Sequence, residues 1–130
     1  MSAQLSGWTV LLIAVAGGLG ALVRFGLQKL LPAHGFHIPL GVLLANVVGS
    51  LIAGFTAGLA LASTDSGTAT ALIVITGFCG GLTTFSTFAV ETIQLNQAGT
   101  GKAAVLNLAA NVVLGLLAAL GGILLATVFA

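Results

Sequence analysis

Long apolar stretches alternate with short polar connectors along this chain. A helix needs roughly 20 apolar residues to cross the hydrocarbon core of a bilayer, and residues 8–31, 40–62, 69–96 and 103–129 each reach that length. Proline, glycine and other turn-forming residues fill the connectors between them. The pattern predicts an all-α membrane protein: a single transmembrane domain over residues 1–130, with four membrane-spanning helices.

Composition strengthens this prediction. Hydrophobic residues make up 58% of the chain and charged residues only 4%, whereas a soluble domain carries about a quarter of its residues as charges. Lipid is therefore the expected solvent. A net charge of +1 offers no basic face, so we expect no nucleic-acid partner.

The sequence gives no sign of an enzyme. His34 and His37 are spaced as H-x-x-H, but they lie on a connector that contains proline and glycine, with no third ligand nearby. No catalytic constellation, phosphate-binding loop or cofactor motif is recognisable.

The few charges also predict an orientation. Arg24, Lys29 and Lys102 fall toward one side of the predicted bundle, and Asp65 falls on the other. Because basic residues favour the cytoplasmic side, this bias places both termini outside the cell.

Two spans have a face of small residues. Helices in lipid associate through close packing of such residues, so the second and fourth spans are expected to make tight protein contacts. The positions recur at intervals of four residues: Gly41, Ala45, Gly49, Ala53 and Ala57 in the second span, and Ala103, Asn107, Asn111, Gly115 and Ala119 in the fourth.

The third span concentrates glycines and hydroxyl side chains near its middle. Gly77, Gly80 and Gly81 fall within five residues, and each glycine costs a helix about 1 kcal/mol relative to alanine. We therefore expect a break near residues 77–83. Irregular backbone at membrane depth occurs where protein or a water-filled cavity satisfies it, so such a break is a candidate ion site.

Two aromatic residues follow the expected break. Phe85 and Phe88 are three residues apart and project from roughly one side of a helix, interleaved with Thr84, Ser86 and Thr87. They are either lipid-facing or core aromatics, or they border a path for a small anion through the positive edges of their rings.

Three asparagines within spans also have two readings. An unpaired amide at membrane depth costs about 1–3 kcal/mol, so Asn46 must find a partner. It either joins helices by hydrogen bonds or donates its N–H groups to a partly dehydrated anion. Asn107 and Asn111 share one helical face and are either packing contacts or a polar lining.

Arg24 and Glu91 are charged residues within predicted spans. Arg24 either extends to the membrane surface or raises the local anion concentration at a vestibule. Glu91 can pair with Arg24 or Lys29.

The sequence resembles the Fluc family of fluoride channels over nearly all of its length. The third-span block, which runs from a glycine cluster into Thr-Thr-Phe-Ser-Thr-Phe with a glutamate three residues later, is the most specific. The matching residues are 17–21 with Arg24, 41–50, 77–88, Glu91 and 107–115.

The resemblance implies an antiparallel, dual-topology homodimer in the cell (plasma or inner) membrane, with two pores along the subunit interface. It also implies a structural sodium ion at the dimer centre, held by the main-chain carbonyls of Gly80 and Thr83. The remaining implied sites are Asn46, Phe85 and Phe88 in the pore, Arg24 in a vestibule, and Ser86, Thr87, Glu91, Asn107 and Asn111 along a polar track.

The function that this resemblance implies is passive, selective flow of fluoride out of the cytoplasm, which protects against fluoride toxicity. An antiparallel dimer needs roughly equal insertion in both directions, whereas the basic residues favour one. A small multidrug-type proton-coupled exporter is the alternative, but it needs a carboxylate in its first span, and no Asp or Glu precedes Asp65. A purely structural membrane subunit would leave the third-span break unexplained.

Overall fold

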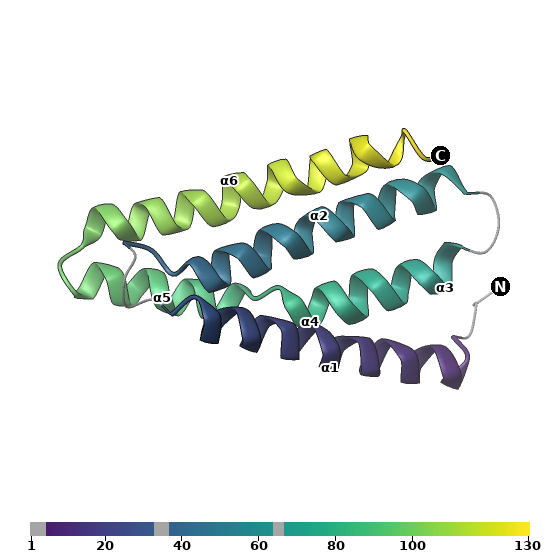
Figure 1. Ribbon diagram of the computed structural model, residues 1–130, viewed down its shortest axis with the longest axis horizontal. Helices are drawn as coiled ribbons and strands as arrows, with labels where there is room; N and C mark the ends of the chain where they lie inside the picture. The colour runs from purple at the N-terminus through teal and green to yellow at the C-terminus, as the bar shows by residue number, and fades with distance from the viewer. Residues whose placement is uncertain (1–4, 33–36, 64–66) are drawn as a thin grey trace.

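The structure of this protein, a computed structural model, describes residues 5–32, 37–63 and 67–130. These residues form four helical spans that are long and apolar enough to cross a membrane. The spans run side by side in an elongated bundle, with the start of the first and the end of the last at the same end (Figure 1). The predicted all-α membrane architecture is confirmed. His34 and Asp65 lie outside the described residues.

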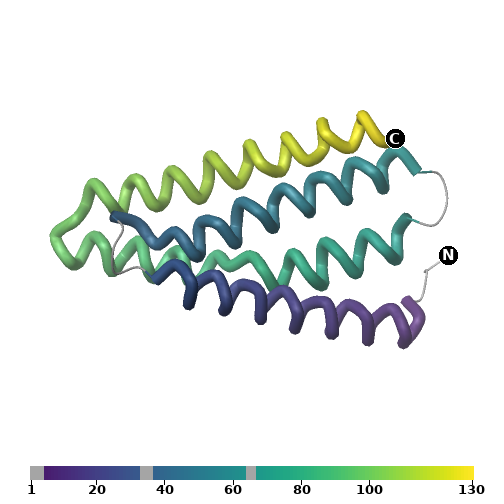
Figure 2. Tube along the Cα trace, viewed as in Figure 1, coloured from purple at the N-terminus to yellow at the C-terminus, as the bar shows by residue number. Residues whose placement is uncertain are grey.

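Three spans are single helices and the third is interrupted. The single helices are α1 (Gly7–Leu30), α2 (Leu40–Ala62) and α6 (Gly101–Ala126). The third span contains α3 (Gly67–Ala71), the π-helical segment η1 (Leu72–Cys79), α4 (Gly80–Leu82) and α5 (Phe85–Gln97). The tube in Figure 2 straightens between α4 and α5, so the predicted break in the third span is confirmed.

The outer surface of the bundle is apolar. Large hydrophobic side chains such as Trp8, Leu61 and Leu124 are exposed, as expected of side chains that face lipid. The most deeply buried residues include Val42, Ala45 and Leu82. A core of so few large side chains agrees with helices held together by close backbone approach.

Helices α2 and α6 make the most extensive contact in the bundle. Their backbones touch at glycines: a Cβ atom on Gly122 would lie 2.6 Å from Phe55 N, and one on Gly54 would lie 2.9 Å from Ala119 Cα. Gly54 and Gly58 of α2 therefore pack against α6, whereas Gly41 and Gly49 of the predicted face lie against α1 and against Leu82 and Thr83 of the third span.

The glycines of the third span pack against α1. A Cβ atom on Gly81 would lie 2.8 Å from Gly17 C, and one on Gly77 would lie 2.8 Å from Ile13 O. From the other side, a Cβ atom on Gly20 would lie 2.8 Å from Leu82 N. These glycines allow two backbones to approach closely while the third span remains helical.

The break lies just after the glycines that were expected to cause it. The chain stays helical through Gly80 and Gly81, and leaves the helix at Thr83 and Thr84, whose ψ angles are 156° and 125°. The expectation that the glycines themselves interrupt the span is wrong in this detail. Gly77 and Gly81 make the contact with α1, whereas Gly80 is exposed and has no α1 atom of the described residues beside it. Other residues end α4.

Candidate functional site

Asn46 of α2 binds the extended backbone at the break. In a continuing helix the Thr84 N–H would donate to Gly80 O, but it donates instead to Asn46 Oδ1 at 2.8 Å. Asn46 Nδ2 donates in return to Thr84 O at 3.1 Å. This pair of bonds satisfies the backbone N–H and C=O of Thr84. Gly80 O therefore lacks the donor that it would have in a continuing helix.

Thr84 also begins the next helix. Its Oγ1 accepts from Thr87 N at 3.2 Å, which is the usual cap of a helix N-terminus. The same hydroxyl donates to Thr87 Oγ1 at 3.0 Å and lies 3.4 Å from Ser86 Oγ. Ser86 and Thr87 therefore take part in a hydroxyl cluster at the start of α5.

A polar chain leads from Asn46 across α6 to α5. Asn46 Nδ2 donates to Asn111 Oδ1 at 2.8 Å. Asn111 Nδ2 donates to Asn107 O at 2.9 Å and to Asn107 Oδ1 at 3.2 Å. Asn107 Nδ2 then donates to Thr92 Oγ1 at 2.9 Å, and Thr92 Oγ1 donates to Phe88 O at 2.7 Å. Each side chain in this series donates a hydrogen bond to the next residue.

This geometry uses both N–H groups of Asn46. One donates to Thr84 O and the other to Asn111 Oδ1. An anion beside Asn46 would therefore have to displace one of these acceptors to receive a hydrogen bond.

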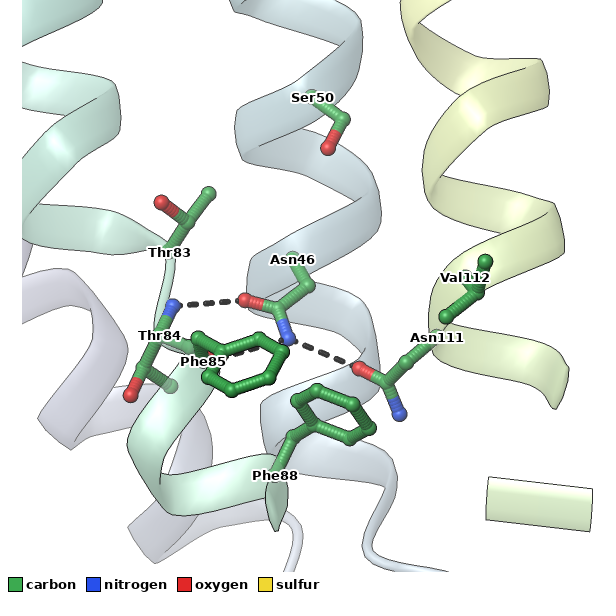
Figure 3. A pocket seen from close by; sticks show the side chains of 8 residues that line it. All are labelled: Asn46, Ser50, Thr83, Thr84, Phe85, Phe88, Asn111 and Val112. Atoms are coloured by element: carbon green, nitrogen blue, oxygen red, sulfur yellow. Dashed lines mark hydrogen bonds between the residues drawn. The ribbon is translucent and has the colours of Figure 1, made fainter. Parts of the chain in front are cut away.

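A pocket of about 330 Å³ opens beside this amide, near the middle of the third span. Figure 3 shows Asn46 at its centre, hydrogen-bonded on one side to Thr84 and on the other to Asn111, with the rings of Phe85 and Phe88 below it. The lining residues are Asn46, Ser50, Thr83, Thr84, Phe85, Phe88, Asn111 and Val112. Five of these eight residues are polar, and Phe85, Phe88 and Val112 form an apolar wall beside them. Convergent polar groups beside an apolar wall are typical of a binding site.

The two phenylalanines differ in exposure. Their ring centroids lie 5.1 Å apart at an interplanar angle of 79°, which is an edge-to-face pair. Phe88 is 5% exposed and Phe85 is 77% exposed. The chain thus buries the Phe88 ring and presents the Phe85 ring on its outer surface.

The charged residues lie outside the pocket lining. Arg24 Nη1 donates to Thr83 O at 3.3 Å, and Lys29 Nζ lies 5.4 Å from the centroid of the Phe25 ring. Glu91 borders a separate cavity of about 70 Å³ between α1, α2 and α5. Its Oε2 is buried and has no hydrogen-bond partner among the described residues, so the expected pairing with Arg24 or Lys29 is not seen in this part of the chain.

The structure brings together only part of the expected site. Asn46, Thr83, Phe85, Phe88 and Asn111 line one pocket. Asn107 is 0% exposed and lies behind that lining, while Ser86, Thr87, Glu91, Arg24 and Gly80 lie outside it.

The sequence did not single out Ser50 or Val112 of the pocket, or Thr92 at the end of the polar chain, and it indicated Thr84 only as a neighbour of the two rings. Ser50 lies one helical turn after Asn46, a spacing that could have placed it on the same face. Thr84 precedes Thr87 by three residues, which is the spacing of a helix cap. Thr92 and Val112 carry no comparable signal.

Comparisons with known proteins identify the family. The family model described as CrcB-like protein, Camphor Resistance (CrcB), matches residues 11–123. The chain is 40% identical over 118 residues to a fluoride-specific ion channel FluC of Pyrococcus abyssi, covering 91% of this chain and 95% of that protein. It is 45% identical over 124 residues to the FluC of Renibacterium salmoninarum, covering 90% and 98%. With a family model and relatives that match over most of its length, the chain belongs to the CrcB-like protein family.

Proposed function

We propose that this protein is a passive, fluoride-selective ion channel that lets fluoride leave the cytoplasm and so protects the cell against fluoride toxicity. Its relatives are named fluoride-specific ion channels. The observation that carries the proposal is the polar pocket at the break of a membrane-spanning helix. A conduction path needs such a place, because an anion cannot leave water for bare hydrocarbon.

The pocket offers an anion weak and replaceable partners. The edges of the Phe85 and Phe88 rings carry partial positive charge, and an N–H of Asn46 is exchangeable between Asn111 Oδ1 and an arriving ion. Among the described residues, no Lys or Arg side chain lines the pocket, so an ion that enters is not trapped. Conduction requires this balance between entry and release.

A second copy of the chain would complete the path. The pocket is open on the outer surface of the protomer, and Phe85 is exposed there. A path bordered by lipid on one side would leave the ion partly unsolvated. An antiparallel, dual-topology homodimer with two pores would cover this surface with protein.

A structural sodium ion would fit the carbonyl groups at the end of α4. Carbonyl oxygens suit a hard cation, and Gly80 O has lost its helical donor because Thr84 N–H bonds to Asn46. Thr83 O already attracts a positive group, since it accepts from Arg24. Gly80 and Thr83 would hold the ion at the dimer centre, and its charge would lower the cost of bringing an anion nearby.

The other polar residues would act outside the protomer's pocket. Arg24 would attract fluoride to a vestibule. Ser86 and Thr87, with Glu91, would continue the polar track once two subunits meet, while Asn107 and Asn111 would contribute through the chain that ends at Asn46.

Fluoride efflux from liposomes containing the purified protein tests the function, with chloride as the comparison ion. We expect fluoride to leave and chloride to be retained. Phe85→Ile and Phe88→Ile should each lower the fluoride flux without separating the dimer. Absent efflux in the wild type, or chloride leaving as fast as fluoride, would refute the channel. Unchanged flux in both variants would remove the rings from the path.

Nothing supports the multidrug-type exporter. An exporter would be expected to have transporters as relatives, whereas the relatives of this chain are named channels. The first span, Gly7–Leu30, contains no carboxylate to carry protons.

A further inference from the structure

Most of the polar side chains that line the pocket already use their hydrogens within the protein. Asn46 Nδ2 donates to Thr84 O and to Asn111 Oδ1. Asn111 Nδ2 donates to two oxygens of Asn107. An anion could take a hydrogen bond from either amide only by breaking one that already exists.

The two threonine hydroxyls of the lining are also in use. The Thr83 hydroxyl donates to Cys79 O at 2.8 Å, and the Thr84 hydroxyl donates to Thr87 Oγ1 at 3.0 Å. A hydroxyl has a single hydrogen, so neither threonine has one left for an anion. One side-chain donor of the lining remains, the hydroxyl of Ser50.

The Ser50 hydroxyl donates to no other residue in the part of the chain that the structure describes. A hydroxyl side chain on a helix often donates to the carbonyl four residues earlier, as the hydroxyls of Thr83 and Thr92 do. For Ser50 that carbonyl belongs to Asn46, and the bond is not made. Gly115 of α6 lies beside Ser50, since a Cβ atom there would be 3.7 Å from Ser50 Oγ, but glycine has no side chain that could accept.

This hydroxyl is accessible from the pocket. Ser50 is half-buried, and it lies on α2 one helical turn after Asn46. Figure 3 shows its side chain on the pocket side of α2, with the oxygen directed toward the level of Asn46. The hydroxyl and the Asn46 amide therefore face the same space.

Ser50 can bind an anion at a lower cost than its neighbours can. Asn46 would have to release Asn111 Oδ1 or Thr84 O before it donated to an arriving ion. The Ser50 hydroxyl has only to rotate about its Cβ–Oγ bond. A hydrogen bond to a charged partner is also about twice as strong as one between neutral groups, so this one donor contributes much of what the pocket can offer.

We propose that the Ser50 hydroxyl is a fluoride-binding group of the pocket and determines how tightly the ion is held there. This inference rests on the proposed function of the same pocket. It adds a hydrogen-bond donor to the ring edges of Phe85 and Phe88, and it assigns that role to a residue that the sequence did not single out.

Fluoride flux into liposomes, measured over a range of fluoride concentrations, tests the proposal with Ser50→Ala. Loss of the hydroxyl should raise the fluoride concentration for half-maximal flux by roughly ten- to a hundredfold, the span of one hydrogen bond to a charged group. Thr56→Val is the matched control, because it removes a hydroxyl from the same helix outside the pocket lining. It should leave the half-maximal concentration at the wild-type value.

The stability of Ser50→Ala without fluoride separates this role from a structural one. If the hydroxyl has no partner in the protein, its removal breaks no bond, and alanine is the better helix former. We therefore expect a Tm equal to that of the wild type or slightly above it. A lower Tm would show that Ser50 bonds within the protein and would overturn the proposal.

Thermal unfolding in sodium fluoride, with equal concentrations of sodium chloride as the reference, measures binding without flux. Because a bound ion stabilises the folded state, fluoride should raise the wild-type Tm more than chloride does. Ser50→Ala should need roughly ten- to a hundredfold more fluoride for the same rise. Equal fluoride dependence of the two proteins, or no fluoride-specific rise in the wild type, would overturn the proposal. A rise that depends on Ser50 without any fluoride flux would instead refute the channel and leave the binding site.

Discussion

Gly122→Ala in α6 should weaken the contact between α2 and α6, whereas Gly121→Ala, one residue earlier, should not. A Cβ atom on Gly122 would lie 2.6 Å from Phe55 N and 3.1 Å from Gly54 C. Both are backbone atoms, which cannot rotate away as a side chain can. At Gly121 no neighbouring atom of the described residues lies within 4 Å of the added atom.

The magnitude follows from two opposing terms. Overpacking of a closely packed contact costs about 1–3 kcal/mol, and replacing glycine by alanine in a helix returns roughly 0.5–1 kcal/mol. Gly122→Ala should therefore lower the free energy of unfolding by up to about 2 kcal/mol, and Gly121→Ala should raise it slightly. The difference between the two variants measures the backbone contact itself.

Thermal unfolding of the purified protein in detergent, followed by loss of the folded peak in size-exclusion chromatography, can measure this difference. We expect the Tm of Gly122→Ala to fall several degrees below that of Gly121→Ala. Gly26→Ala in α1 is a second control, because its surroundings are equally open. Equal Tm values for the variants at 121 and 122 would show that the two backbones are not in contact at this point.

Two further predictions concern the break in the third span. Asn46→Leu should destabilise the protein by about 1–3 kcal/mol for each backbone polar group of Thr84 left unpaired. Thermal unfolding measures this loss, with Asn96→Leu as an exposed control. Equal stability of the two variants would contradict the role of Asn46. If Gly80 and Thr83 hold the proposed sodium ion, exchanging sodium for N-methylglucamine should lower the Tm of the protein. An ion at 100 times its dissociation constant stabilises the bound state by about 2.7 kcal/mol. A Tm independent of sodium from micromolar to molar concentrations would remove the ion from Gly80 and Thr83.

The number and type of the spans could be predicted from the sequence because they depend on local properties. Segment length and the lack of charge are visible residue by residue, and so is the glycine and threonine cluster that marked the third span. The position of the break was less accessible. Gly81 permits either a break or a close contact, and the choice depends on Gly17, about sixty residues away in the sequence.

The sequence predicted which residues belong to the site better than it predicted the hydrogen bonds between them. Asn46 and Phe88 stand out in the sequence as a polar and an aromatic residue at a suggestive place, and both line the pocket. That Asn46 binds the backbone of Thr84 follows only when α2 lies beside the break. The spacing of Asn107 and Asn111 indicates one shared face, but the burial of Asn107 depends on Thr92 of another helix.

The glycine contacts between α1 and the third span fix the axial register of these two helices. Gly20 meets Leu82, and Arg24 stands one helical turn further along α1, level with Thr83, to which it donates. A slide of one residue along α1 would bring Leu19 or Ala21 against the Leu82 backbone, where neither side chain fits. The position of Gly20 in the first span thus determines the position of Arg24 along the membrane normal, relative to the break in the third span.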